Sequence, residues 1–266
     1  IGATSGANIL GLHVCPDPMR IVAQAASSQF GTSLGSVELI HAIQRDSKKR
    51  EAAARQTFDA FAERVSSGAG MSQGQALMPS WQDVEDDPVD ATIAAARYAD
   101  LVVIGRAPKN GELAADHIAS ILVKCGRPLL LVPEQPVETV GLHIAVAWKE
   151  TAEAARAVTA AMPLLSRAKR VAVISASEPD SVAPQEFGSA ARLAEQLSHH
   201  GFSPEAQDIS VSALPVSETL IRAARGFGAD LLVAGAYSHS RFRELVFGGF
   251  TRQVLHACDL PVLLLH

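Results

Sequence analysis

Short blocks of consecutive apolar residues alternate with Ala-rich stretches of helical length along most of the chain. Blocks of about five residues rich in Val, Ile and Leu are typical of strands buried on both faces between helices. In the second half they predict strands near His143–Trp148, Arg170–Ser175, Glu205–Val211, Ala229–Gly235 and Val262–Leu265. Helices are expected between them near Thr151–Ser166, Pro184–His200, Ser217–Gly226 and Gly248–Ala257. The series predicts a doubly wound parallel α/β sheet of flavodoxin-like topology, with strand order 3-2-1-4-5.

One pattern occurs in both halves of the chain. Ala99–Gly105 matches Ala229–Gly235, and Arg127–Pro133 matches Leu260–His266. Repeated strand patterns at corresponding places indicate a duplicated structural unit. We therefore predict two tandem α/β domains, which cover residues 1–134 and 140–266.

The first copy lacks the opening strand and helix of the second. Its first apolar block, Asn8–Val14, corresponds by its order to Arg170–Ser175, the second strand of the other copy. The first strand is central in this strand order, and its absence leaves backbone groups unpaired and the core incomplete. We therefore expect the natural chain to begin about 25–40 residues upstream, the usual size of a strand and helix.

A long polar segment interrupts the first copy from Pro16 to about Lys49. It is rich in Ser, Gln and Gly, with helix-like patches around Val37–Gln44. Long connections of this kind are often flexible or cover a site. We expect a flexible excursion or a lid.

Composition restricts the class of partner. The 266 residues are 48% hydrophobic and carry a net charge of −5, which allows two cores and disfavours nucleic acid and anionic membranes as partners. Three widely spaced cysteines argue against a zinc site and a disulfide framework. No apolar run approaches the roughly 18 residues of a membrane helix, and nothing resembles a signal peptide. A cytoplasmic protein is expected.

The loop after the fourth strand of the second copy carries the candidate chemistry. It runs from Gly235 to Thr251 and ends in a glycine pair, Gly248 and Gly249, at a predicted helix start. Backbone N–H groups at such a helix start bind phosphate, and Arg241, Arg243 and the Thr251 hydroxyl are further donors. The alternative is that the glycines only allow close packing of helix on sheet, with the arginines in a solvated loop.

This loop resembles the ATP loop of the universal stress protein family, whose pattern is Gly-x2-Gly-x9-Gly-(Ser/Thr). Gly235 and Gly248 match family glycines, Ser238 stands at the second glycine, and Gly249 stands at the Ser/Thr position. Thr251 lies where many nucleotide-binding members also have a Thr. The resemblance covers essentially the whole chain, as a two-domain member without its first strand and helix.

A second departure from the family lies at the end of the first strand. Trp148 occupies the position of an Asp that usually helps to hold the nucleoside. The indole can stack on a base or fill the pocket, and both remain open. The binding residues that the resemblance implies are Ala147, Trp148, Gly235, Ser238, His239, Gly248, Gly249, Phe250 and Thr251.

The resemblance implies a stress-response protein whose second domain binds ATP or a related adenine nucleotide with Mg²⁺. The alternative is an interaction module of the same family that binds no nucleotide. His239 has no identifiable Ser, Cys or Asp partner, so we expect no enzyme, or at most slow ATP hydrolysis. No metal-ligand spacing is present.

The first copy has no comparable loop. Its equivalent, Gly105–Gly111, is shorter and leads to Lys124-Cys125-Gly126 without a glycine pair, so no phosphate site is expected there. In the family, the last strands of two domains commonly pair across a dyad. The resemblance therefore implies that the two copies imitate a homodimer within one chain, and further self-association is plausible.

Overall fold

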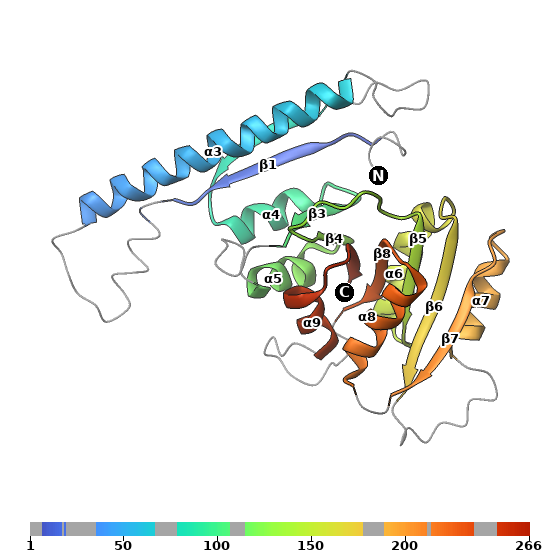
Figure 1. Cartoon of the computed structure of the whole chain (residues 1–266). Helices are drawn as coiled ribbons and strands as arrows, with labels where there is room; N and C mark the ends of the chain where they lie inside the picture. Colours follow the sequence, from blue (N-terminus) through green and yellow to red (C-terminus); the bar gives the residue numbers. More distant parts are fainter. Residues whose placement is uncertain are drawn as a thin grey trace. The chain divides into compact units, whose positions relative to one another are not determined.

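The computed structural model describes residues 7–17, 19, 36–66, 79–106, 115–177, 189–211, 214–236 and 249–266 (Figure 1). Its contacts divide the chain into two compact units, Ile1–Ala95 and Ala96–His266. The boundary predicted between residues 134 and 140 falls inside the second unit, and it stays a prediction.

The first unit contains a two-stranded parallel sheet and a long helix. Its elements are β1 (Leu10–Cys15), α3 (Ser36–Ser66), β2 (Ser80–Glu85) and most of α4 (Pro88–Ala96). β1 pairs with β2 from Leu10↔Ser80 to Cys15↔Glu85. α3 packs against β1, and a Cβ added to Gly11 would lie 2.7 Å from the Phe58 ring.

The long helix corrects one expectation. Residues 36–49 were expected to belong to a flexible excursion with helix-like patches around Val37–Gln44, but they form the continuous first part of α3. The Gly and Ser residues before Ser36 suggested a loop, yet the following Glu, Lys, Arg and Ala residues favour helix strongly. The remainder of the predicted excursion, residues 18 and 20–35, lies outside the described residues.

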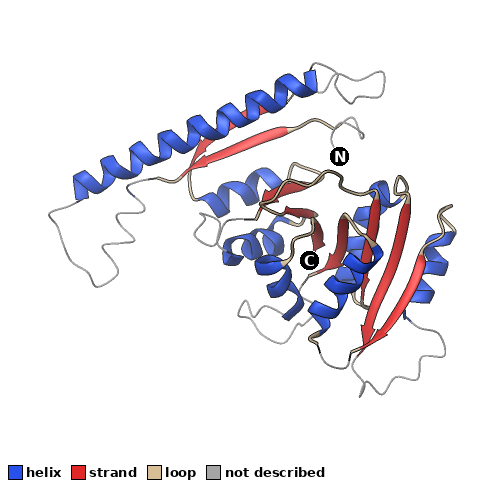
Figure 2. Ribbon diagram, viewed as in Figure 1, coloured by secondary structure: helices blue, strands red, loops and turns tan. Residues whose placement is uncertain are grey.

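The second unit is built on one seven-stranded sheet (Figure 2). Its strands are β3 (Val102–Gly105), β4 (Leu129–Val132), β5 (His143–Trp148), β6 (Arg170–Ser177), β7 (Glu205–Ser210), β8 (Leu231–Gly235) and β9 (Val262–Leu265). They lie in the order β3-β4-β9-β8-β5-β6-β7. Counted from β5 along the chain, the five strands of the second half therefore have the order 3-2-1-4-5.

One junction in this sheet differs from the prediction of two separate sheets. β4 and β9 pair antiparallel, with Leu129 opposite Leu264 and Leu131 opposite Val262, whereas every other ladder of the sheet is parallel. The last strands of the two halves thus pair directly, as the family resemblance implied. β3 and β4 extend the sheet of the second half, and β1 and β2 form the separate two-stranded sheet.

Helices cover both faces of the seven-stranded sheet. They are α5 (Ala115–Cys125), α6 (Ala152–Leu165), α7 (Ser189–Ser198), α8 (Val216–Phe227) and α9 (Gly249–Ala257). Apolar side chains of α6 and α7 form a buried core with alternate residues of the strands, among them Val146 and Val233. α8 packs on β6 and contacts α9, which also contacts α5.

A carboxylate holds the start of β5. Asp230, just before β8, accepts hydrogen bonds from the backbone N–H groups of Gly141, Leu142 and His143 at 2.9, 3.1 and 2.9 Å. Charge-assisted bonds of this kind are about twice as strong as neutral ones. Asp230 therefore connects the two strands at the centre of the fold.

Candidate functional site

The candidate site lies at the carboxyl ends of β5 and β8, near the N-terminus of α9. β5 and β8 are adjacent in the sheet, and the chain leaves them in opposite directions, toward β6 and toward β9. Ligands of open α/β sheets bind at such a point, where the strand order reverses. The structure brings Ala147 and Ala234 together here as direct neighbours on β5 and β8.

Part of the predicted loop lies outside the described residues. Ser238, His239 and Gly248 belong to this part, as do Arg241 and Arg243. The residues of the predicted site whose positions are described are Ala147, Trp148, Gly235, Gly249, Phe250 and Thr251.

Gly235, the last residue of β8, is required by packing. A Cβ at this position would lie 2.7 Å from the carbonyl carbon of Glu153 and closer still to the backbone nitrogen of Ala154. Both atoms belong to the first turn of α6, whose N-cap Thr151 accepts a hydrogen bond from the same Ala154 nitrogen at 3.3 Å. The absence of a side chain at Gly235 thus lets the positive end of α6 approach β8.

Trp148 and Ala147 form the end of β5. Ala147 is buried, and Trp148 is half-buried and packs against the apolar core beneath α6 and α7. Trp148 lies opposite Ser175 of β6, whose hydroxyl donates to Asp208. The indole therefore contributes to the core. From the sequence it was expected either to stack on a base or to fill the nucleoside pocket.

The start of α9 combines an exposed backbone with a buried hydroxyl-bearing residue. Gly249 is exposed, and a Cβ added there would meet no atom within 4 Å, so packing against the described residues does not require this glycine. Thr251 is buried, with 3% of its surface exposed. Gly249 thus offers a bare backbone at a positive helix end, whereas Thr251 is directed into the protein.

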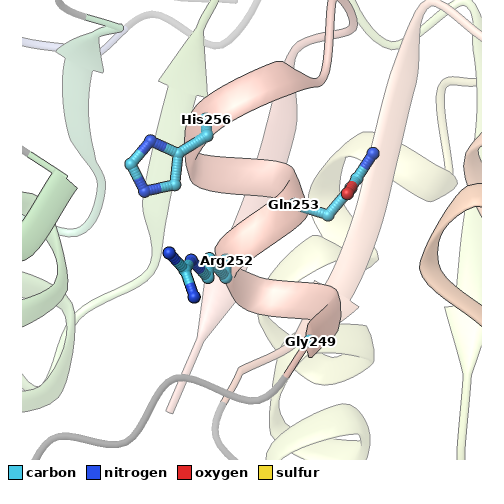
Figure 3. Close-up of a pocket in the computed structure, with 4 residues that line it drawn as sticks. All are labelled: Gly249, Arg252, Gln253 and His256. Atoms are coloured by element: carbon cyan, nitrogen blue, oxygen red, sulfur yellow. The ribbon is translucent and has the colours of Figure 1, made fainter.

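A shallow hollow of about 250 Å³ lies on the outer surface of α9 (Figure 3). Gly249, Arg252, Gln253 and His256 line it, and Arg252 and His256 point to the same side of the helix. Residues three and four apart share one face of a helix. Arg252, Gln253 and His256 were not among the residues predicted for the site, although their spacing within the predicted helix places them on one face.

The other end of α9 is held by a residue of the first half. Arg106, directly after β3, donates from Nη2 to the carbonyl oxygen of Val254 at 2.8 Å. Burial lowers the pKa of Arg106 and raises the pKa of the neighbouring Cys258 thiol. The guanidinium satisfies one of the last carbonyls of α9, where positive charge is favourable. From the sequence, Arg106 lies in the loop Gly105–Gly111, where no phosphate site is expected, and no pattern there indicates this contact.

The described residues contain no group of three His, Cys, Asp or Glu that could hold a metal ion. No helix in this part of the chain is both long and apolar enough to cross a membrane.

Comparison with known proteins identifies the second half. The model of the universal stress protein family matches residues 142–266. Universal stress protein Slr1230 of Synechocystis sp. (strain ATCC 27184 / PCC 6803 / Kazusa) is 26% identical over 176 residues. That match covers 62% of this chain and 57% of the relative, so the chain spans little more than half of the curated relative's length.

Solved structures share the fold across nearly the whole chain. A universal stress protein from Archaeoglobus fulgidus DSM 4304 superposes with a TM-score of 0.63 at 12% identity, covering 96% of this chain and 95% of that one. A functionally unknown protein from Pseudomonas aeruginosa PAO1 superposes with a TM-score of 0.52 at 16% identity, with coverages of 98% and 93%. These likenesses concern the fold alone. The family match thus places residues 142–266 with the universal stress protein family, and the solved structures add a likeness of fold alone.

Proposed function

We propose that the second half binds an adenine nucleotide, with the phosphates at the N-terminus of α9, and that the protein acts in a stress response through this binding. The exposed backbone of Gly249 carries the proposal, because no described neighbour explains the absence of a side chain there. A phosphate accepting hydrogen bonds from free N–H groups at this helix end supplies a reason.

Two features of the second half support an anionic ligand. Arg252, one turn into α9, is exposed on the helix surface next to Gly249 and adds positive charge. The N-terminus of α6, held close to β8 by Gly235, contributes a second positive helix end. The proposed site therefore favours a triphosphate over a neutral ligand.

The base of the nucleotide is the part that Trp148 affects. An indole at the end of β5 has a flat face on which adenine stacks, and it offers no carboxylate to the ribose. We therefore propose recognition that is weaker and less specific for the sugar than an acidic residue would give.

Calorimetry with ATP and Mg²⁺ on the whole chain tests the proposal. Gly249→Glu is the informative variant, because a glutamate is favourable in the first turn of a helix and repels a phosphate at the same place. We expect the wild type to bind with saturable heat and Gly249→Glu to bind at least about tenfold more weakly, a difference of 1.4 kcal/mol. Gln196→Glu, on the exposed surface of α7, adds the same charge and should leave the affinity unchanged. Absence of heat at millimolar ATP would refute the proposal.

The packing of Trp148 favours a second candidate, an interaction module of the same family that binds no nucleotide. In this case the half-buried indole occupies the base pocket as part of the core. Trp148→Asp then creates ATP binding in a chain that otherwise has none. Saturable binding to the wild type in the micromolar range would exclude this candidate.

A further inference from the structure

We infer that Arg106 is a positioning residue for the proposed phosphate site, because it holds the C-terminal end of α9 while the ligand would bind at the N-terminal end. Through this residue, the first half of the chain controls the affinity of the second half for its ligand. This role rests on the proposed function and adds a regulatory contact to the same site. Three features support it: the place of Arg106 in the sheet, the burial of its side chain and the shortness of α9.

The arrangement of the sheet brings Arg106 to the end of α9. β3 runs parallel to β4, and the backbone N–H of Arg106 donates to the carbonyl oxygen of Val132, the last residue of β4, at 2.7 Å. β4 pairs antiparallel with β9, so this end of β4 lies beside the start of β9, which follows α9 in the chain. The guanidinium therefore reaches the carbonyl oxygen of Val254, one of the last four carbonyls of α9, at 2.8 Å.

The matching residue of the second half offers no such side-chain bond. Ala236 follows β8 as Arg106 follows β3, and its backbone N–H donates in the same way to the carbonyl oxygen of Leu265 at 2.9 Å. The side chain of Ala236 is a methyl group without a hydrogen-bond donor, so it cannot bind the corresponding end of α5. The contact is thus specific to α9, the helix that begins with the exposed Gly249.

The burial of Arg106 indicates a purpose other than stability. Its Nε is buried and has no hydrogen-bond partner among the residues that the structure describes. Burial lowers the pKa of the guanidinium, although the Cys258 thiol and the Asp259 carboxylate act on this pKa in the opposite direction. An apolar side chain of similar length would fill the same space without this cost. A buried donor without a partner calls for an explanation, and accurate placement of a helix end supplies one.

α9 is short enough for one end to affect the other. It has 9 residues, whereas isolated helices of fewer than about 12–15 residues are marginal in water. Val254 lies only about 7.5 Å along the helix from Gly249, at a rise of about 1.5 Å per residue. Loss of the Arg106 bond therefore loosens the N–H groups that would face a phosphate, and a less ordered site binds more weakly. By linkage, a ligand that orders α9 strengthens the contact with Arg106 and so acts on the first half.

Calorimetry with ATP and Mg²⁺ on the whole chain tests this role with three variants. Arg106→Met removes the hydrogen bond but keeps a long side chain, and we expect it to weaken ATP binding about tenfold or more. Arg106→Lys retains a donor for the Val254 carbonyl and should restore the affinity to within about threefold of the wild type. Arg127→Met is the matched control and should bind like the wild type. Arg127 donates from Nη2 to the Arg97 carbonyl oxygen at the same distance of 2.8 Å, but it lies at the opposite end of β4.

Hydrogen exchange without nucleotide shows whether the bond affects the phosphate end of α9. In an α-helix, the amide hydrogens of Gln253 and Val254 bond to the carbonyls of the first two residues of α9, so their exchange reports on the first turn. We expect Arg106→Met to accelerate exchange at these two amides about tenfold, and Arg127→Met to leave it unchanged.

Two results would overturn the inference. One is ATP binding that Arg106→Met leaves unchanged, or that both methionine variants weaken equally. The other is accelerated exchange confined to His256 and Ala257, at the far end of α9. Absence of ATP binding to the wild type would refute the proposed function instead, and exchange at the first turn would then decide alone whether Arg106 positions the start of α9. If circular dichroism shows Arg106→Met to be unfolded, Arg106→Gln replaces it, because the shorter amide side chain also loses the reach to α9.

Discussion

Gly235→Ala should destabilise the second unit strongly, although it adds a single methyl group. The new Cβ would lie 2.7 Å from the Glu153 carbonyl carbon and closer still to the Ala154 nitrogen, whereas an ordinary contact begins at 3.4 Å, so α6 must move by at least about 0.7 Å. The obstructing atoms are backbone and cannot rotate away. The same movement would break the bond between the Ala154 nitrogen and Thr151, which is already 3.3 Å long.

The expected cost combines these effects. Overpacking costs about 1–3 kcal/mol and loss of an N-cap about 1 kcal/mol, while replacing glycine by alanine returns about 0.4–1 kcal/mol by restricting the unfolded chain. We expect Gly235→Ala to lower the free energy of unfolding by about 1–3.5 kcal/mol. Gly105→Ala, the matching position with open space, should change it by less than about 1 kcal/mol, in the stabilising direction.

Urea unfolding measures the difference. The chain has two tryptophans, so in a Trp81→Phe background the fluorescence comes from Trp148, which ends β5 just before α6. With a urea dependence of about 2–3 kcal/mol per M, the midpoints of the two alanine variants should differ by roughly 1 M. Equal midpoints would show that the close approach of α6 does not require a glycine at position 235. A role of Gly235 in ligand binding would then be the better explanation of this glycine.

Three further predictions concern stability and thiol reactivity. Asp230→Ala should lower the free energy of unfolding by about 2–4 kcal/mol in the same urea assay, because three charge-assisted hydrogen bonds are lost. Asp100→Ala, at the matching position of the first half, should cost less than about 0.5 kcal/mol. Similar costs for the two variants would contradict the role of the Asp230 hydrogen bonds. Arg106→Ala should destabilise the second unit by about 1–3 kcal/mol through loss of its bond to α9, and no change in the urea midpoint would refute this. Alkylation of the native protein near neutral pH, followed by peptide mass mapping, should modify half-buried Cys15 well before Cys258, since burial raises the pKa of the Cys258 thiol and keeps it protonated until the pH passes that value. Equal labelling rates would contradict the burial of Cys258.

Much of the second half could be predicted from the sequence, because its strands are continuous apolar blocks that fit only a sheet covered on both faces. The predicted ranges His143–Trp148 and Val262–Leu265 are confirmed to the residue. The start of α3 could be predicted only as helix-like patches around Val37–Gln44, since the Gly and Ser residues before Ser36 favour a loop and hide how long the helix is.

The candidate site was less predictable. A glycine that admits a ligand and a glycine that admits a helix both lack a side chain, so sequence cannot distinguish Gly249 from Gly235. The atoms around each glycine distinguish them: the backbone of α6, which is far from the loop in sequence, lies against Gly235, and no described atom lies within 4 Å of a Cβ at Gly249. Arg106 escaped detection for a similar reason, because its partner Val254 lies 148 residues away.

Because β4 pairs antiparallel with β9, the two halves should stay associated in the folded state even when the peptide that connects them is cut. Residues 134–139, which join β4 to the second half, are exposed and lie outside the sheet, so they are the natural place for a protease to cut. After such a cut, β4 would still be bonded to β9 and Arg106 to α9, and the two fragments would migrate together until a denaturant separated them. The amide hydrogens of Leu129–Leu131 should accordingly exchange with solvent as slowly as those of Val262–Leu264, as members of one cooperative unit.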